Sequence, residues 1–103
     1  MTKTELKTEL EKVAKTFYLW APIGTKTPYI VYTWDNVPNV GADDHVYQKV
    51  AAVVIQSYFT DLADLDALDS VVDSIGYYVS SCVYDDNSET YIKTYTLEVI
   101  DNG

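Results

Sequence analysis

The chain has no arginine, a single cysteine and four glycines among its 103 residues. Proteins favour arginine for phosphate contacts and base readout, so its absence argues against a sequence-specific nucleic-acid binder. The one cysteine, Cys82, excludes a disulfide framework within the chain and leaves too few ligands for a zinc cluster. Because the glycines are scattered, the chain also has no phosphate-cradling loop.

Long hydrophobic runs are also missing. None approaches the roughly 20 apolar residues that a membrane helix needs, so we expect no membrane partner. The segment Met1–Thr16 alternates lysine and glutamate without an apolar core, and it therefore predicts no signal peptide. With 48% hydrophobic residues, the chain can bury a core without disulfides or a structural metal. We expect a single domain over residues 1–103.

The charge is strongly negative and unevenly distributed along the chain. The formal net charge is −9. Residues 1–34 carry five lysines and three glutamates, whereas residues 35–103 carry two lysines and thirteen acidic residues. An acidic surface repels DNA, so this charge suits a protein that keeps DNA from adhering or one that mimics DNA.

The hydrophobic periodicity predicts two helices and five strands. Two segments repeat apolar residues at helical spacing, and a capping box of Thr2 and Glu5 opens the first of them. The second starts at Thr60 or Asp61, and Gly76 ends it. Runs rich in β-branched and aromatic residues predict the strands. The predicted helices are 4–16 and 61–75, and the predicted strands are 17–20, 29–34, 46–59, 77–84 and 91–100.

The order α-β-β-β-α-β-β predicts an α+β fold, with two helices packed on one face of a mainly antiparallel sheet of four or five strands. The run Ala51–Ile55 is apolar on both sides of the pleat, which is typical of a central strand. We therefore expect helices to cover one side of this strand and a partner to cover the other. The loop Asp35–His45 is long for a hairpin connection and is a candidate contact surface.

No arrangement of catalytic or metal-binding residues stands out. The only histidine, His45, would need a serine or Cys82 beside it, and a Gly-x-Ser-x-Gly elbow is missing. We expect Cys82 to be a small buried hydrophobe and His45 to be a loop or interface residue. The aspartates of the second helix lack the spacing of a calcium loop, and Asp43-Asp44-His45 is too crowded for one metal. The sequence therefore predicts no enzymatic activity, no metal and no cofactor.

Several segments, taken in order, resemble a known family. They are Phe-Tyr-Leu-Trp-Ala-Pro at 17–22, Pro-Tyr-Ile-Val-Tyr at 28–32, Ala-Asp-Asp-His-Val-Tyr at 42–47, Tyr-Phe at 58–59, the acidic helix and the tyrosine-rich hairpin. The pattern is similar to the small tail terminators of siphophages and prophages of Gram-positive bacteria, a family also labelled tail-completion, head–tail joining or minor capsid proteins. The resemblance covers roughly residues 4–100 and consists of packing and turn residues.

The resemblance implies a structural role at the tail–neck junction of a virion, after assembly in the bacterial cytoplasm. Tail terminators form a ring, usually a hexamer, that stops polymerisation of the tail tube and joins it to the neck. The implied partners are further copies of the chain, the major tail protein and a neck or head-completion protein. A ring needs a heterologous interface. The candidate interface residues are Trp20, Trp34, Asp35, Val37, Val40, Asp43, Asp44 and His45.

DNA passes through such a ring, so an acidic lumen would keep the DNA from adhering. Acidic residues gather on the predicted second helix, opposite its leucines, and at the tip of the last hairpin. The candidate lumen residues are Asp66, Asp69, Asp73, Asp85, Asp86 and Glu89. Two alternatives stay open, namely another neck or head-completion protein and an acidic DNA-mimicking inhibitor encoded by a mobile element.

Overall fold

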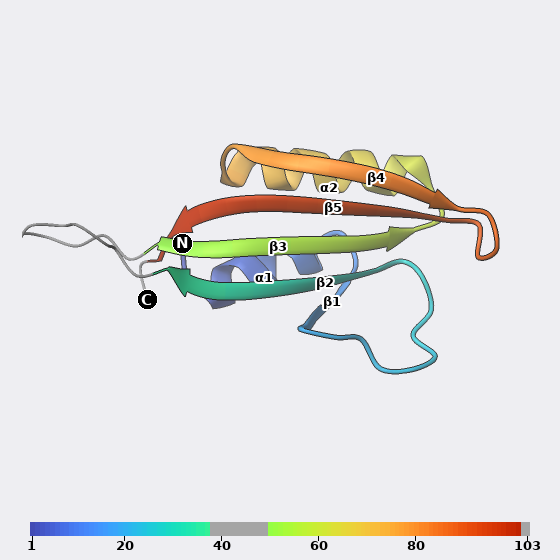
Figure 1. Cartoon of the computed structure of the whole chain (residues 1–103), viewed down its shortest axis with the longest axis horizontal. Helices are drawn as coiled ribbons and strands as arrows, with labels where there is room; N and C mark the ends of the chain where they lie inside the picture. The colour runs from blue at the N-terminus through green and yellow to red at the C-terminus, as the bar shows by residue number, and fades with distance from the viewer. Residues whose placement is uncertain (38–49, 102–103) are drawn as a thin grey trace, which may run out of the picture.

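The computed structural model describes residues 1–37 and 50–101 (Figure 1). In this part of the chain, two helices and five strands follow the predicted order, and the α+β fold class is confirmed. The elements are α1 (Lys3–Glu11), β1 (Lys15–Tyr18), β2 (Tyr29–Val37), β3 (Val50–Phe59), α2 (Leu62–Ile75), β4 (Tyr78–Asp85) and β5 (Thr90–Ile100).

The five strands form one sheet in the order β1-β2-β3-β5-β4. β1 pairs with β2 in parallel, and every other pair of neighbours is antiparallel. β3 is the central strand, as the run Ala51–Ile55 predicted. The two edges differ in length, since β1 has 4 residues and β4 has 8.

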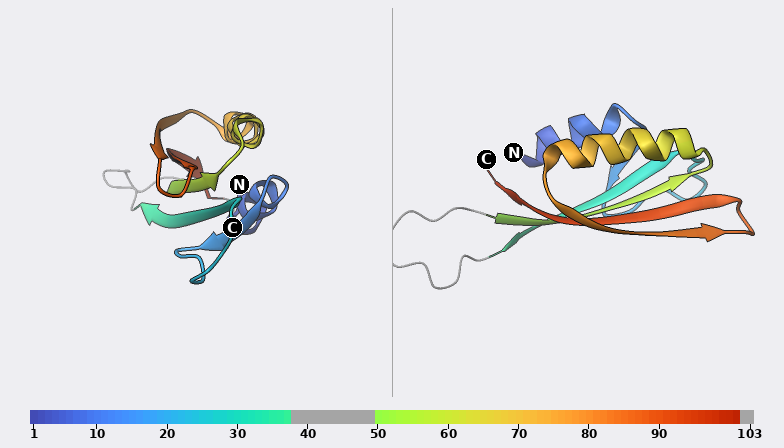
Figure 2. Two further views of the ribbon diagram at one scale, coloured as in Figure 1. Left: turned by 90° about the vertical axis from the view of Figure 1, so that its right-hand side faces the viewer. Right: turned by 90° about the horizontal axis from the view of Figure 1, so that it is seen from above.

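Both helices lie on one face of the sheet, as Figure 2 shows and as the sequence predicted. The apolar stripes of the helices explain this arrangement, because Leu6 and Leu10 of α1 and Leu68 of α2 are fully buried. These side chains pack against alternate residues of the strands, which point to the same side of the pleat. The buried sheet residues on that side are Thr16, Ile30, Tyr32, Trp34, Ala51, Val53, Ile55, Ser57, Phe59, Tyr95, Leu97 and Val99.

Local sequence sets the starts of both helices. The Thr2 hydroxyl accepts a hydrogen bond from the Glu5 N–H at 3.1 Å, and the Glu5 carboxylate accepts one from the Thr2 N–H at 2.9 Å. The predicted capping box is therefore confirmed, and its backbone hydrogen bond lowers the pKa of Glu5. Asp61 caps α2 by accepting from the Ala63 N–H at 2.9 Å, and Gly76 follows the last turn.

The predicted bounds are wrong for the first helix and for the first two strands, and the first strand is Lys15–Tyr18 instead of 17–20. The first helix ends at Glu11 instead of continuing to residue 16, because Lys15–Tyr18 pairs with β2 as strand β1. Pairing with the sheet therefore outweighs a helical periodicity that runs on in the sequence. The second strand continues to Val37, so Asp35 lies in β2, opposite Ala52 of β3, and not in a loop.

Candidate interaction surface

The side of the sheet that faces away from the helices is the candidate interaction surface, which we call the open face. Within residues 1–37 and 50–101, no helix or strand lies over it (Figure 2). Burial alternates along β3, where core-facing side chains are buried and most of their neighbours are half-buried or exposed. The residues of the open face are Phe17, Tyr29, Val31, Thr33, Ala52, Val54, Gln56, Tyr58, Val79, Ser81, Val83, Ile92, Thr94 and Thr96.

The open face is built from apolar, threonine and tyrosine side chains. The charged residues on the same side of the sheet lie at strand ends, where Lys15, Asp35, Asp85 and Glu98 mark its margin. A surface whose middle carries apolar, tyrosine and hydroxyl side chains but no charge is typical of a protein interaction site. The expected cover of the central strand by a partner stays a prediction, and this is the surface on which that partner would bind.

Three aromatic rings order one end of the open face. Tyr29 stacks on Tyr58 with ring centroids 4.6 Å apart, and Phe17 meets Tyr29 edge-on at 6.4 Å. The Tyr58 hydroxyl donates to Oε1 of Gln56 at 2.8 Å, and burial raises the pKa of Tyr58. Rings held in this way give a preformed, largely apolar contact surface.

The connection between β1 and β2 presents apolar side chains to solvent. Leu19 has φ = 71°, and the Trp20 N–H donates to the Tyr18 carbonyl at 2.9 Å, which forms a γ-turn. A leucine in this region is strained, and such strain persists at functional sites when the surroundings enforce it. Here the Leu19 N–H donates to the Tyr32 carbonyl at 3.0 Å. The turn directs Trp20 outward, with 68% of its surface exposed.

A shallow groove joins this connection to the open face. It has a volume of about 290 Å³ and lies between Leu19–Ala21 and side chains of β2 and β3. The sheet residues that line it are Tyr29, Val31, Gln56 and Tyr58. Further along the connection, Ile23 is fully exposed. One chain therefore offers both a protruding apolar loop, residues 19–23, and an apolar sheet surface.

Asp69 does not belong to the exposed acidic face of α2 where the sequence placed it. Its Oδ1 accepts a hydrogen bond from Nζ of Lys93 at 2.7 Å and another from the Tyr95 hydroxyl, both on β5. Burial and the hydrogen bond to Asp69 raise the pKa of Tyr95. Asp66 and Asp73 are exposed. Of the three aspartates predicted to form an acidic face, Asp69 therefore binds side chains of β5, whereas Asp66 and Asp73 face solvent.

The acidic hairpin tip is divided in the same way. Asp85 accepts from the Asn87 N–H at 3.1 Å and from the Ser88 hydroxyl at 2.9 Å, so it organises the turn between β4 and β5. Asp86 and Glu89 are exposed. Among the candidate lumen residues, the exposed ones are Asp66, Asp73, Asp86 and Glu89.

The candidate interface residues fall into four groups. Trp20 and Asp35 are exposed, as an interface would require. The placement of Trp34 at an interface is wrong, because the helices and sheet bury it to 7% exposure. Val37 is the last residue of β2 and pairs with Val50 of β3. The remaining candidates lie outside the described residues, and they are Val40, Asp43, Asp44 and His45.

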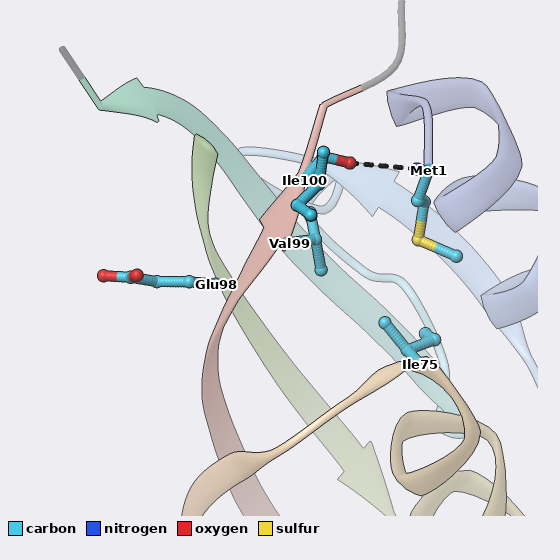
Figure 3. A pocket seen from close by; sticks show the side chains of 5 residues that line it. All are labelled: Met1, Ile75, Glu98, Val99 and Ile100. Carbon is cyan, nitrogen blue, oxygen red and sulfur yellow. Dashed lines mark hydrogen bonds between the residues drawn. The ribbon is translucent and has the colours of Figure 1, made fainter. Parts of the chain in front are cut away.

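The hollow beside the N-terminus does not bring side chains of catalytic type together. The hollow in Figure 3 has a volume of about 420 Å³ and is lined by Met1, Ile75, Glu98, Val99 and Ile100. The Met1 amino group donates to the Ile100 carbonyl at 2.9 Å, whereas Glu98 points away from the other lining residues. Such a hollow joins the N-terminal segment to the end of β5 and offers no acid–base pair.

The expectation that Cys82 is buried is wrong. The thiol is exposed on β4, because this strand lies at the sheet edge and its side chains are open to solvent on both faces. Among residues 1–37 and 50–101, no three His, Cys, Asp or Glu side chains are placed to hold a metal ion. Neither helix in this part of the chain is long and apolar enough to cross a membrane.

Neither a scan against protein-family models nor a search of curated proteins found a match for this chain.

Sequence reasoning identified Trp20 but missed the exposure of Leu19, Ile23 and the valines of β4. Residues 77–84 contain no charge and no proline, so the sequence lacks the usual signals of an edge strand.

Proposed function

We propose that this chain is a structural protein of a bacteriophage head–tail connection, a tail terminator that forms a ring on the tail tube and joins it to the neck. The observation that carries the proposal is the open face together with the protruding loop 19–23. The sequence resemblance supplies the particular role, and the geometry supports self-assembly in general.

A ring requires two different patches on each chain that fit one another. The loop 19–23 is one such patch, since Leu19 is 58% exposed, Trp20 is 68% exposed and Ile23 is fully exposed. The open face is the other, because its middle is uncharged, it is ordered by stacked rings and it is uncovered by other elements of the described chain. Tryptophan is a preferred anchor of protein interfaces, so we assign Trp20 as the central contact of the ring.

The charge supports passage of DNA through the ring. Asp66 and Asp73 project from α2, and Asp86 and Glu89 project from the hairpin tip. Either pair, repeated around a ring, would give a negative lumen that repels the phosphate backbone. Asp69 and Asp85 are committed to contacts within the chain and are not assigned to the lumen.

Deleting the gene from the phage or prophage that carries it tests the role directly. Loss of a tail terminator leaves the tube free to polymerise, so we expect tubes of excessive and variable length, without heads, in electron micrographs. Tubes of normal length beside unjoined heads would instead identify a neck or head-completion protein. Normal virions would contradict both roles and favour the acidic DNA mimic.

Replacing Val54 by lysine places a charge at the centre of the open face, where the native side chain is 37% exposed. We expect the variant to fold and to lose binding to tail tubes, because an interface core tolerates charge poorly. Cosedimentation with tubes of the major tail protein measures the loss. Thr4→Lys, on the exposed side of α1, is the matched control and should bind normally. Equal binding by both variants would remove the open face from the proposed ring.

Reversing the exposed acids tests the lumen. We expect Asp66→Lys/Asp73→Lys, or else Asp86→Lys/Glu89→Lys, to slow DNA ejection from assembled phage, because lysines in the lumen bind phosphate. The variant that does so identifies the acids that line the channel. Ejection measured at two salt concentrations should differ most for that variant, since the attraction is screened. Unchanged ejection in both variants would exclude an acidic lumen built from these residues.

A further inference from the structure

The edge strand β4 has features that proteins normally avoid at a sheet edge. The segment 77–84 carries no charged residue and no proline, and Val79 and Val83 are each 63% exposed. Unpaired N–H and C=O groups on a long, uncharged edge are a template for pairing with another strand. The opposite edge, β1, is only 4 residues long and begins with a lysine. The two edge strands of the described sheet are therefore not equivalent, and β4 is the longer of the two.

The sequence of this edge also reads nearly the same in both directions. Residues 78–84 are Tyr-Val-Ser-Ser-Cys-Val-Tyr, a palindrome about Ser81 that is broken only by the similar side chains of Ser80 and Cys82. Antiparallel pairing of a strand with its own copy places residues opposite one another symmetrically about a central residue. We propose that two copies of this chain pair through β4, antiparallel, about a twofold axis at Ser81.

This register matches like with like across the new strand pair. Tyr78 lies opposite the partner's Tyr84, Val79 opposite the partner's Val83, and Ser80 opposite the partner's Cys82. Aromatic and β-branched residues directly opposite one another stabilise antiparallel pairs. A slip by two residues in one direction would place Val79 opposite a serine and Tyr78 opposite the thiol, and a slip in the other would place Val83 and Tyr84 opposite serines. The palindrome therefore selects one register among those that keep the side chains on their proper faces.

The symmetry places the two helical layers on the same side of the joined sheet, because the twofold axis of an antiparallel pair is perpendicular to the sheet. Each chain has a formal net charge of −9, so the two copies repel one another electrostatically. Added salt screens that repulsion, and the dimer should therefore become tighter as ionic strength rises. This dependence is opposite to that of a complex held by charge attraction.

The β4 dimer does not rest on the proposed ring function. A paired edge is isologous, whereas a ring interface is heterologous and uses the open face and the loop 19–23. Pairing of one strand from each copy buries less area than a standard interface, so we expect a Kd of about 1–100 µM. Analytical ultracentrifugation over a range of concentrations measures the association, and a monomer at every concentration would overturn the proposal.

Cross-linking tests the register. Residues opposite one another in an antiparallel pair have Cα atoms about 4.5–5.5 Å apart, within the span of a disulfide of about 4.4–6.8 Å. In Ser81→Cys/Cys82→Ala, the introduced thiols meet at the twofold axis, and we expect a disulfide-linked dimer on mild oxidation. The control is Ser80→Cys/Cys82→Ala, whose two thiols are diagonal neighbours about 7–8 Å apart and should not link. Ser80→Cys alone retains Cys82 as the opposite thiol and should link.

Charge at the edge tests the contact itself. We expect Val79→Lys to raise the Kd at least about tenfold, because charged residues block edge pairing. Val54→Lys, on the open face and away from β4, should dimerise as the native chain does. Equal dimerisation by Val79→Lys and the native chain would overturn the proposal, as would a disulfide in the diagonal control but not at position 81. If Ser80→Lys, on the helical side of β4 and outside the open face, is monomeric yet still binds tail tubes, the dimer and the ring are separate assemblies.

Discussion

Replacing Trp34 by alanine is expected to lower the free energy of unfolding by about 3–5 kcal/mol, the range for deleting a buried aromatic side chain. Replacing Trp20 by alanine should change it by no more than about 0.5 kcal/mol, as for other surface positions. The two tryptophans therefore have opposite roles, although the sequence presents both as aromatic residues beside a turn.

The difference follows from where each indole lies. Trp34 points to the helical side of β2 and is 7% exposed, within the same core cluster as Leu6 and Leu10 of α1. Its removal leaves a cavity that the rigid sheet beneath cannot close. Trp20 is 68% exposed after the γ-turn at Leu19, so its removal changes little within the chain. If Trp20 is the anchor of the proposed ring, the same change abolishes binding to tail tubes.

Urea unfolding followed by far-ultraviolet circular dichroism measures both effects without depending on tryptophan emission. Trp20→Phe and Trp34→Phe are the conservative controls, and each should lie between the alanine variant and the native chain. A large loss of stability for Trp20→Ala would show that the loop 19–23 packs on the chain more tightly than its exposure indicates. If the Trp20→Ala variant still binds tail tubes, Trp20 is not the anchor of the interface.

Much of the fold follows from periodicity, and the errors occur where pairing at long range decides. The stripe of α1 continues in the sequence through Val13, yet the chain leaves the helix at Glu11 to form β1. The end of β2 is polar, yet its backbone pairs with β3 as far as Val37. In both cases the backbone hydrogen bonds of the sheet outweigh local preference, and these bonds depend on residues far away in the sequence.

The candidate site was harder to predict, because exposure at a sheet edge depends on strand order. Hydrophobic neighbours placed Cys82 in the core, but β4 is an edge strand because β5 lies between it and β3. Asp69 shows the converse error. Its helical position suggested solvent, but Lys93 and Tyr95 of β5 lie beneath that turn of α2 and bind its carboxylate. The hydrophobic periodicity of a segment does not specify the order of strands in a sheet or the lateral position of a helix above it.

The cluster of Asp69, Lys93 and Tyr95 is expected to make the fold sensitive to alkali. Burial removes water from the Tyr95 phenol. The Asp69 carboxylate accepts a hydrogen bond from the Tyr95 hydroxyl and would repel the negative charge of a phenolate. The pKa of Tyr95 is therefore raised above the value of about 10 that it has in the unfolded chain. The folded state keeps the proton more tightly than the unfolded state does.

The sign of the effect follows from this difference. Below about pH 10 both states carry the proton, and the contribution of Tyr95 to stability is fully present. Above that pH the unfolded chain loses the proton first, so the free energy of unfolding falls as pH rises towards the folded pKa. One proton corresponds to a slope of about 1.4 kcal/mol per pH unit. Tyr32 and Tyr58, whose pKa values burial also raises, add smaller contributions of the same sign.

Urea unfolding of the Tyr95→Phe variant isolates the contribution of this residue. Near neutral pH we expect it to be less stable by about 1–2 kcal/mol, because the hydrogen bond to Asp69 is lost. Above about pH 10 its stability should decline less steeply than that of the native chain. Tyr77→Phe, which changes a ring that is 88% exposed, is the control and should keep the native slope. Parallel declines for Tyr95→Phe and the native chain would show that alkaline unfolding is set by other groups, and that Asp69 holds Tyr95 without controlling its titration.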